Sequence, residues 1–148
     1  MRALLATDGS EASADAIRAG RELLPDGTAW HLVTVIPPMV DPNEDTTGFA
    51  GPLIGPEEAS TEHVEDVITG DGRLAAAART LGPEPVDQWV LEGKPGEEIC
   101  ALAAAMPADV VVVGARGGNA VSRALLGSVS SYVVEHAPCA VLVVPSDV

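Results

Sequence analysis

A run of consecutive valines at residues 110–113 limits most strongly how this chain can fold. A strand that is apolar on both faces needs cover on both faces, which is typical of a parallel sheet between layers of helices. Other apolar segments have the length of strands, at residues 4–7, 30–35, 86–91 and 140–144. Segments with helical period separate them. This alternation predicts an α/β fold, with a single doubly wound (Rossmann-like) five-stranded parallel sheet.

Helix-like segments connect these strands at residues 11–24, 64–81, 95–106 and 122–135. Ser10 can cap the first of them, and Pro95 suits the first position of the third. In the second, Gly70 and Gly72 each cost about 1 kcal/mol relative to alanine, which favours a kink. Residues 37–58 hold five prolines and three glycines without a periodic pattern, so we expect a long, flexible surface loop there.

The length of 148 residues fits one domain, and the composition limits what that domain binds. The chain carries 22 acidic and 8 basic residues, for a net charge of −14, and Lys94 is its only lysine. A field of this sign argues against binding to nucleic acid or to anionic membranes, because their phosphates attract basic surfaces. No apolar run approaches the roughly 18 residues that cross a bilayer. A phosphate ligand would therefore need local backbone dipoles and a cation.

Two features favour a cytoplasmic location. The first residues reach Asp8 before the apolar core of a signal peptide could form. Cys100 and Cys139 stand in apolar surroundings, without a CxxC motif or a histidine at metal-ligand spacing. We therefore expect both to be buried, reduced thiols, as in a compartment where disulfides are rare.

Two segments at the ends of predicted strands have the composition of a ligand site: residues 7–10, which read TDGS, and the glycine cluster at residues 114–118. In a doubly wound sheet, ligands bind at the carboxyl ends of strands where the winding direction reverses. Glycines there let a ligand approach the backbone, and amides at a helix start suit a phosphate. Gly127 interrupts a helical period before Ser128 and Ser130, and a break would present amides and hydroxyls together. Tight turns and close helix packing would explain the same glycines.

The spacing of the glycines distinguishes between known nucleotide-binding motifs. The phosphate-loop motif GxxxxGK[ST] and the dinucleotide motif GxGxxG are both absent. From residue 114 to residue 128 the spacing is G-x2-G-x9-G-[ST], which resembles the signature of the ATP-binding branch of the universal stress protein family. The resemblance covers essentially residues 1–148, including the TDGS turn, the GKP segment at residues 93–95 and the closing segment at residues 138–145.

This resemblance implies the strand order 3-2-1-4-5, with the first and fourth strands meeting at the switch point. It implies that ATP lies there, with Ala6, Thr7, Asp8 and Val35 around the adenine and ribose, Val113 and Gly114 beside the nucleoside, and Gly117, Gly127, Ser128, Val129 and Ser130 at the phosphates. Arg116 and Arg123 lie near the glycines and could touch phosphate, although exposed solubilising arginines are an equal explanation. Asp8 could hold Mg²⁺ with the nucleotide. Many relatives have proline at Ala6, where we expect only backbone and apolar contact.

We interpret the chain as an ATP-binding regulatory or stress-response module. No residue near the glycines is placed as a general base, so ATP hydrolysis is expected to be slow or absent. Two alternatives stay open: an adenylate-using ATPase or transferase in which Asp8 holds the metal, and a nucleotide-free dimeric interaction module. Residues 140–144 carry no charge and form an edge strand in the implied order. We therefore also expect a homodimer paired through this C-terminal strand.

Overall fold

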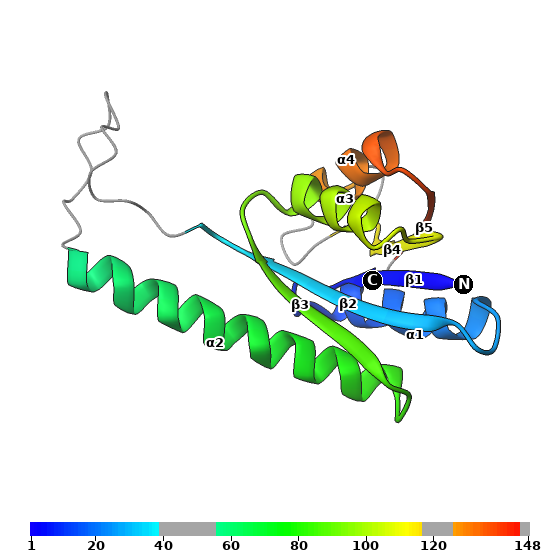
Figure 1. Cartoon of the computed structure of the whole chain (residues 1–148), viewed down its shortest axis with the longest axis horizontal. Helices are drawn as coiled ribbons and strands as arrows, with labels where there is room; N and C mark the ends of the chain where they lie inside the picture. The colour runs from blue at the N-terminus through cyan, green and yellow to red at the C-terminus, as the bar shows by residue number, and fades with distance from the viewer. Residues whose placement is uncertain (39–55, 117–125, 146–148) are drawn as a thin grey trace.

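The computed structural model shows a central sheet with helices on both faces (Figure 1). It describes residues 1–38, 56–116 and 126–145. All neighbouring strands are parallel, in the order β3-β2-β1-β4-β5, which confirms the predicted fold. The strands are β1 (Arg2–Ala6), β2 (Ala29–Ile36), β3 (Val86–Glu92), β4 (Val110–Gly114) and β5 (Ala140–Val144).

The helices form two layers, one on each face of the sheet (Figure 1). They are α1 (Glu11–Leu23), α2 (Pro56–Leu81), α3 (Pro95–Ala105) and α4 (Ser128–His136). Helices α1 and α2 pack on one face, and α3 and α4 pack on the other. None of the helices in the described part of the chain is long and apolar enough to cross a membrane.

The valine run forms the middle of this sandwich. Val110 and Val112 pack in a cluster with residues of α1 and α2, whereas Val111 and Val113 pack with residues of α3 and α4. All are buried, with at most 7% of the residue surface exposed. The prediction that this strand is covered on both faces is therefore confirmed. This strand pairs with β1, at the point where the winding of the sheet reverses.

Helix α2 differs from its prediction at the start and in shape. It begins at Pro56, so the expectation of a loop over residues 37–58 is wrong for its last three residues; proline suits a first helical position because it lacks an N–H. Residues 39–55 lie outside the described part. The helix is continuous through Gly70 and Gly72 (Figure 1). Gly70 has a packing reason, because a Cβ there would lie 3.3 Å from side-chain atoms of Ile36 and Val90.

The fourth helix starts later than its sequence pattern indicates. Gly127 has extended backbone, with φ −64° and ψ 164°, and it caps α4, which begins at Ser128. The predicted start near residue 122 is therefore wrong at Leu126 and Gly127, and residues 122–125 lie outside the described part. Gly127 precedes the helix and does not interrupt it.

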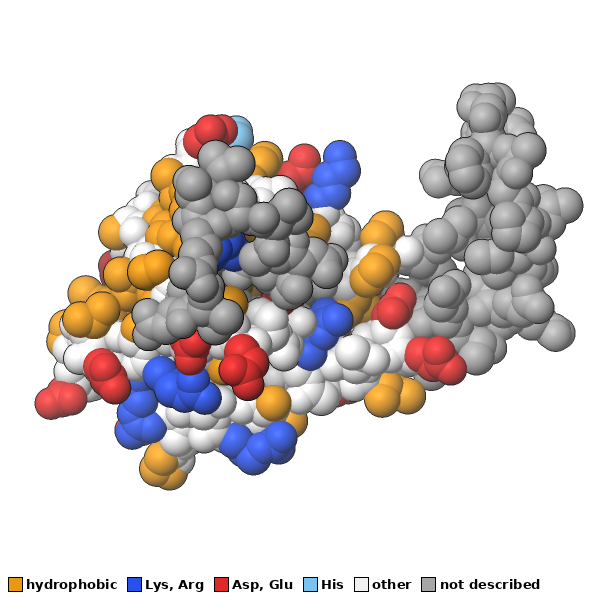
Figure 2. All heavy atoms as spheres, turned by 180° about the vertical axis from the view of Figure 1, so that it is seen from behind, with side chains coloured by type: hydrophobic (Ala, Val, Ile, Leu, Met, Phe, Trp, Pro, Cys, Tyr) orange, Lys and Arg blue, Asp and Glu red, His pale blue; other side chains and the backbone are white. Residues whose placement is uncertain are grey.

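Charged side chains of both signs are scattered over the back of the molecule (Figure 2). In Figure 2, lysine and arginine side chains form small groups on this face, next to acidic side chains. Among the residues drawn in colour there, no continuous basic stripe is visible.

Alanine substitutions at two helical glycines test how the helices pack, because one glycine faces open space and the other a neighbouring side chain. Gly72→Ala should stabilise the protein by about 0.5–1 kcal/mol, because an added Cβ has no atom within 4 Å and alanine favours a helix. Gly96→Ala should destabilise it by about 1–3 kcal/mol, because its Cβ would lie 2.7 Å from Cδ1 of Tyr132, where α3 meets α4. Urea unfolding of both variants measures the two shifts. A Gly96→Ala variant as stable as the parent would contradict this packing.

Candidate functional site

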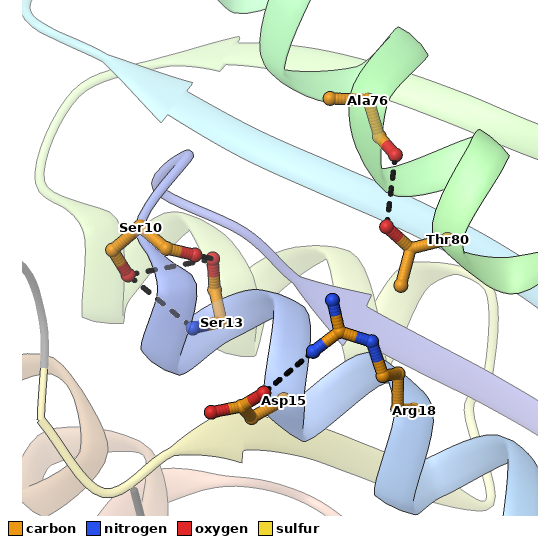
Figure 3. Close-up of polar contacts among 6 residues, drawn as sticks. All are labelled: Ser10, Ser13, Asp15, Arg18, Ala76 and Thr80. Atoms are coloured by element: carbon orange, nitrogen blue, oxygen red, sulfur yellow. Dashed lines mark hydrogen bonds and ion pairs between the residues drawn. The ribbon is translucent and has the colours of Figure 1, made fainter. Parts of the chain in front are cut away.

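The chain leaves β1 through a tight turn at Asp8, Gly9 and Ser10. Gly9 has φ 82°, a left-handed conformation that glycine adopts without steric strain. The Oδ1 atom of Asp8 accepts a hydrogen bond from the Ser10 amide at 2.9 Å. Ser10 then caps α1, since its Oγ accepts a bond from the Ser13 amide at 3.2 Å (Figure 3). The turn therefore has a fixed shape, with Asp8 exposed at the carboxyl end of β1.

A chain of hydroxyl groups holds this turn from inside. The Gly9 amide donates to Oγ1 of Thr7 at 3.1 Å, and this oxygen lies 3.0 Å from Oγ of Ser13. Ser13 donates its single hydroxyl hydrogen to the carbonyl of Ser10 at 2.8 Å, so Thr7 is the donor to Ser13. Thr7 is buried, at 7% exposed. Its hydroxyl is thus used within the turn, and a ligand would reach the main chain of Thr7 instead.

The end of β4 lies directly against the start of α1. An added Cβ at Gly114 would lie 3.2 Å from the carbonyl oxygen of Ala12. Only glycine allows this approach without a shift of the backbone. Close packing therefore explains the glycine at residue 114. The same contact brings the end of β4 beside the turn after β1. Arg116 follows and is half-buried.

The main chain of Ala115 joins β4 to both β5 and α4. Its amide donates to the carbonyl of Val144 at 2.8 Å, and its carbonyl accepts from the Gly127 amide at 2.7 Å and from Oγ of Ser130 at 2.8 Å. Ser130 is 2% exposed, and its Oγ also lies 3.1 Å from the carbonyl of Gly127. Its hydroxyl hydrogen therefore goes to main-chain carbonyls. A contact of Ser130 with phosphate would use its amide.

Three apolar site candidates lie on the face of the sheet that α3 and α4 cover. Val113 is buried, while Ala6 and Val35 are half-buried and pack against the same cluster. They stand at or near the carboxyl ends of β4, β1 and β2. They place apolar side chains near the carboxyl ends of these strands, and Ala6 lies two residues before Asp8.

Part of the predicted site lies outside the described residues, namely Gly117 and Arg123. Within the described ranges, Ser128 is exposed and Val129 is half-buried at the start of α4. No group of three or more His, Cys, Asp or Glu side chains suited to a metal occurs in these ranges.

Arg73 also lies at the candidate site, although nothing in the sequence pattern predicted it. A Cβ at Gly9 would lie 2.9 Å from Cγ and 3.3 Å from Nε of Arg73, so the arginine side chain crosses the turn after β1. Arg73 belongs to α2 and is half-buried. The turn and α2 are far apart in the chain, and only tertiary packing brings them together.

The two cysteines are free thiols. They are half-buried, so the prediction that both are buried is wrong. Burial raises the pKa of Cys100, with a smaller contribution from Cys139; it also raises the pKa of Cys139, with a smaller contribution from Asp109. A raised pKa keeps a thiol protonated at neutral pH, which makes it a poor nucleophile.

Solved structures share this fold along nearly the whole chain. The protein MJ0577 superposes with a TM-score of 0.78 at 21% identity, over 99% of this chain and 96% of that one. A universal stress protein in complex with cAMP gives a TM-score of 0.59 at 23% identity, over 97% and 96% of the two chains. The protein At3g01520 of Arabidopsis thaliana, with AMP bound, gives 0.62 at 17% identity, over 99% and 92%. At these identities the likeness shows the fold alone.

Sequence comparison shows the family. The model of the universal stress protein family matches residues 1–145. Universal stress protein MJ0531 of Methanocaldococcus jannaschii is 31% identical over 150 residues, which cover 95% of this chain and 79% of that protein. Universal stress protein Slr1101 of Synechocystis sp. is 50% identical over a shorter stretch of 54 residues, 36% of this chain and half of that protein. The chain belongs to the universal stress protein family.

Proposed function

We propose that this protein binds ATP at the edge where β1, β4 and the start of α4 meet, and that it acts as a regulatory module of the stress response. The observation that carries the proposal is the arrangement around Ala115. Hydrogen bonds from Gly127 and Ser130 to its carbonyl hold the start of α4 at the end of β4. The start of a helix is thereby fixed at the switch point of a doubly wound sheet, where such folds bind ligands.

The start of α4 supplies hydrogen-bond donors for a phosphate chain. The first amides of a helix have no partner within it, and the helix dipole adds partial positive charge there. In α4 the first amide bonded back to the cap is that of Ser131, which donates to the carbonyl of Gly127 at 2.9 Å. The preceding amides therefore suit phosphate oxygens. Gly117, Gly127, Ser128, Val129 and Ser130 would surround the phosphates, as the family signature implies.

The sheet edge beside α4 suits an adenine and a ribose. Ala6, Val35 and Val113 offer apolar contact, and Asp8 stands exposed on a rigid turn where it can accept a hydroxyl hydrogen. Related folds with AMP and with cAMP bound support an adenine nucleotide as the ligand class. The half-buried reduced thiols and the acidic composition support a cytoplasmic location.

Binding should depend on magnesium. With a net charge of −14, the protein repels a polyphosphate, and Mg²⁺ offsets part of the phosphate charge. Titration calorimetry should show ATP binding that strengthens when Mg²⁺ is added, with GTP bound more weakly. Native mass spectrometry of the purified protein gives an independent readout of retained nucleotide. No heat with any adenine nucleotide at millimolar concentration would contradict the proposed function.

We also propose a homodimer paired through β5. This strand is an edge of the sheet, next to β4 alone, and it carries no charged residue. Its valines and its leucine are half-buried, so part of their apolar surface is open. Pairing with the same strand of a second copy about a two-fold axis would satisfy the open backbone groups of both edges.

A further inference from the structure

Arg73 is the starting point, because its side chain lies over the turn after β1. Its aliphatic stem lies on Gly9, with Cγ and Nε within 3.3 Å of the place that a Cβ there would take. The residue is half-buried in a turn of α2 that faces the end of β1. Within residues 1–38, 56–116 and 126–145, its guanidinium makes no hydrogen bond or ion pair.

Two arginines of α1 have protein partners. Arg18 pairs with Asp15 at 2.6 Å (Figure 3), and Arg21 pairs with Glu84 at 3.0 Å and also donates to the carbonyl of Leu81. The chain has 22 acidic residues, so carboxylates are abundant. Among the described residues, the buried side-chain polar atoms without a hydrogen-bond partner are His31 Nδ1 and Thr34 Oγ1, so the guanidinium of Arg73 is open to solvent and can bind an anion. Arg73 thus has the surroundings of a ligand contact.

We propose that Arg73 binds the phosphate chain of the nucleotide; the proposal rests on the ATP site described above. Arg73 approaches the β1 turn from the face of the sheet that α1 and α2 cover, while α4 belongs to the opposite face. The phosphates would then lie between the guanidinium on one side and the helix start on the other. The planar fork of a guanidinium matches two phosphate oxygens, and its charge offsets the repulsion of an acidic protein.

The position of Arg73 makes the number of phosphates a specificity determinant. A contact with the phosphate chain contributes to ATP affinity, less to AMP affinity and nothing to adenosine affinity. A residue that only shapes the turn at Gly9 would affect the three ligands equally. The ligand series therefore separates an electrostatic contact from a structural one.

The test measures dissociation constants of adenosine, AMP and ATP by calorimetry for the parent and the variants. Arg73→Gln should weaken ATP binding by about tenfold or more and change adenosine binding by less than about twofold. Arg73→Lys keeps the charge without the fork and should give an intermediate loss. Arg79→Gln is the matched control: it removes the same charge from an exposed site about 9 Å further along α2, and it should change ATP binding by less than about twofold.

The outcomes distinguish a phosphate contact of Arg73 from a structural role at the turn and from failure of the proposed ATP site. Arg73→Gln variants that bind ATP as tightly as Arg79→Gln variants would overturn the role of Arg73 and leave the ATP site intact. An equal loss for adenosine and ATP would also overturn it, because Arg73 would then only support the turn. If the parent binds none of the three ligands, the proposed function itself fails, and the role of Arg73 fails with it. Arg73→Met keeps the stem over Gly9, and its urea midpoint shows whether folding accounts for any loss.

Discussion

Gly127→Val should reduce ATP affinity by at least about thirtyfold while the protein remains folded. The φ of −64° at Gly127 is allowed for any residue, so valine introduces no backbone strain there. Its branched side chain would stand beside the first amides of α4, in the space proposed for phosphate oxygens. Calorimetry with Mg-ATP measures the loss, and circular dichroism with urea unfolding checks the fold.

The size of the side chain at Gly127 provides a graded comparison. Gly127→Ala adds one methyl group and should weaken ATP binding less than Gly127→Val. Gly72→Val is the control, because it places the same side chain in open space on α2 and should leave binding unchanged. A folded Gly127→Val protein that binds ATP like the parent would show that the phosphates lie elsewhere.

The second large effect concerns assembly: Val143→Lys should convert the proposed dimer to a monomer. A charge within β5 places an ammonium group in an apolar seam, where its desolvation opposes strand pairing. Sedimentation at tens of micromolar should show a parent dimer and a variant monomer. Gln88→Lys is the matched control, because Gln88 is exposed on β3 at the opposite edge of the sheet. A monomeric parent, or a Val143→Lys protein that dimerises unchanged, would remove this interface.

The sheet was predictable from sequence because its strands are short, apolar and separated by helical period. The run at residues 140–144 matches β5 residue for residue. The start of α4 was not predictable from spacing alone. Apolar residues continue at helical period across Gly127, but the Gly127 amide bonds to Ala115 at the end of β4 and not to a preceding helical turn.

The candidate site was predictable to the extent that it depends on local sequence. The turn at Asp8, Gly9 and Ser10 is close in the chain and was expected at the end of β1. The contact between Gly9 and Arg73 depends on how α2 packs on the sheet, which no local pattern encodes. The hydrogen bond of the buried Ser130 hydroxyl to the carbonyl of Ala115, just after β4, is likewise a tertiary contact.

The bonds at Ala115 have a consequence for how this protein can be studied. This residue fastens β5, β4 and α4 with its main-chain N–H and C=O alone, and its side chain is only a methyl group. Alanine scanning leaves the position unchanged, and most other replacements keep both backbone groups. An alanine scan would therefore not test Ala115, although it joins the end of β4 to β5 and to the start of α4. Only a change to the backbone itself, such as proline, which removes the N–H, probes this joint.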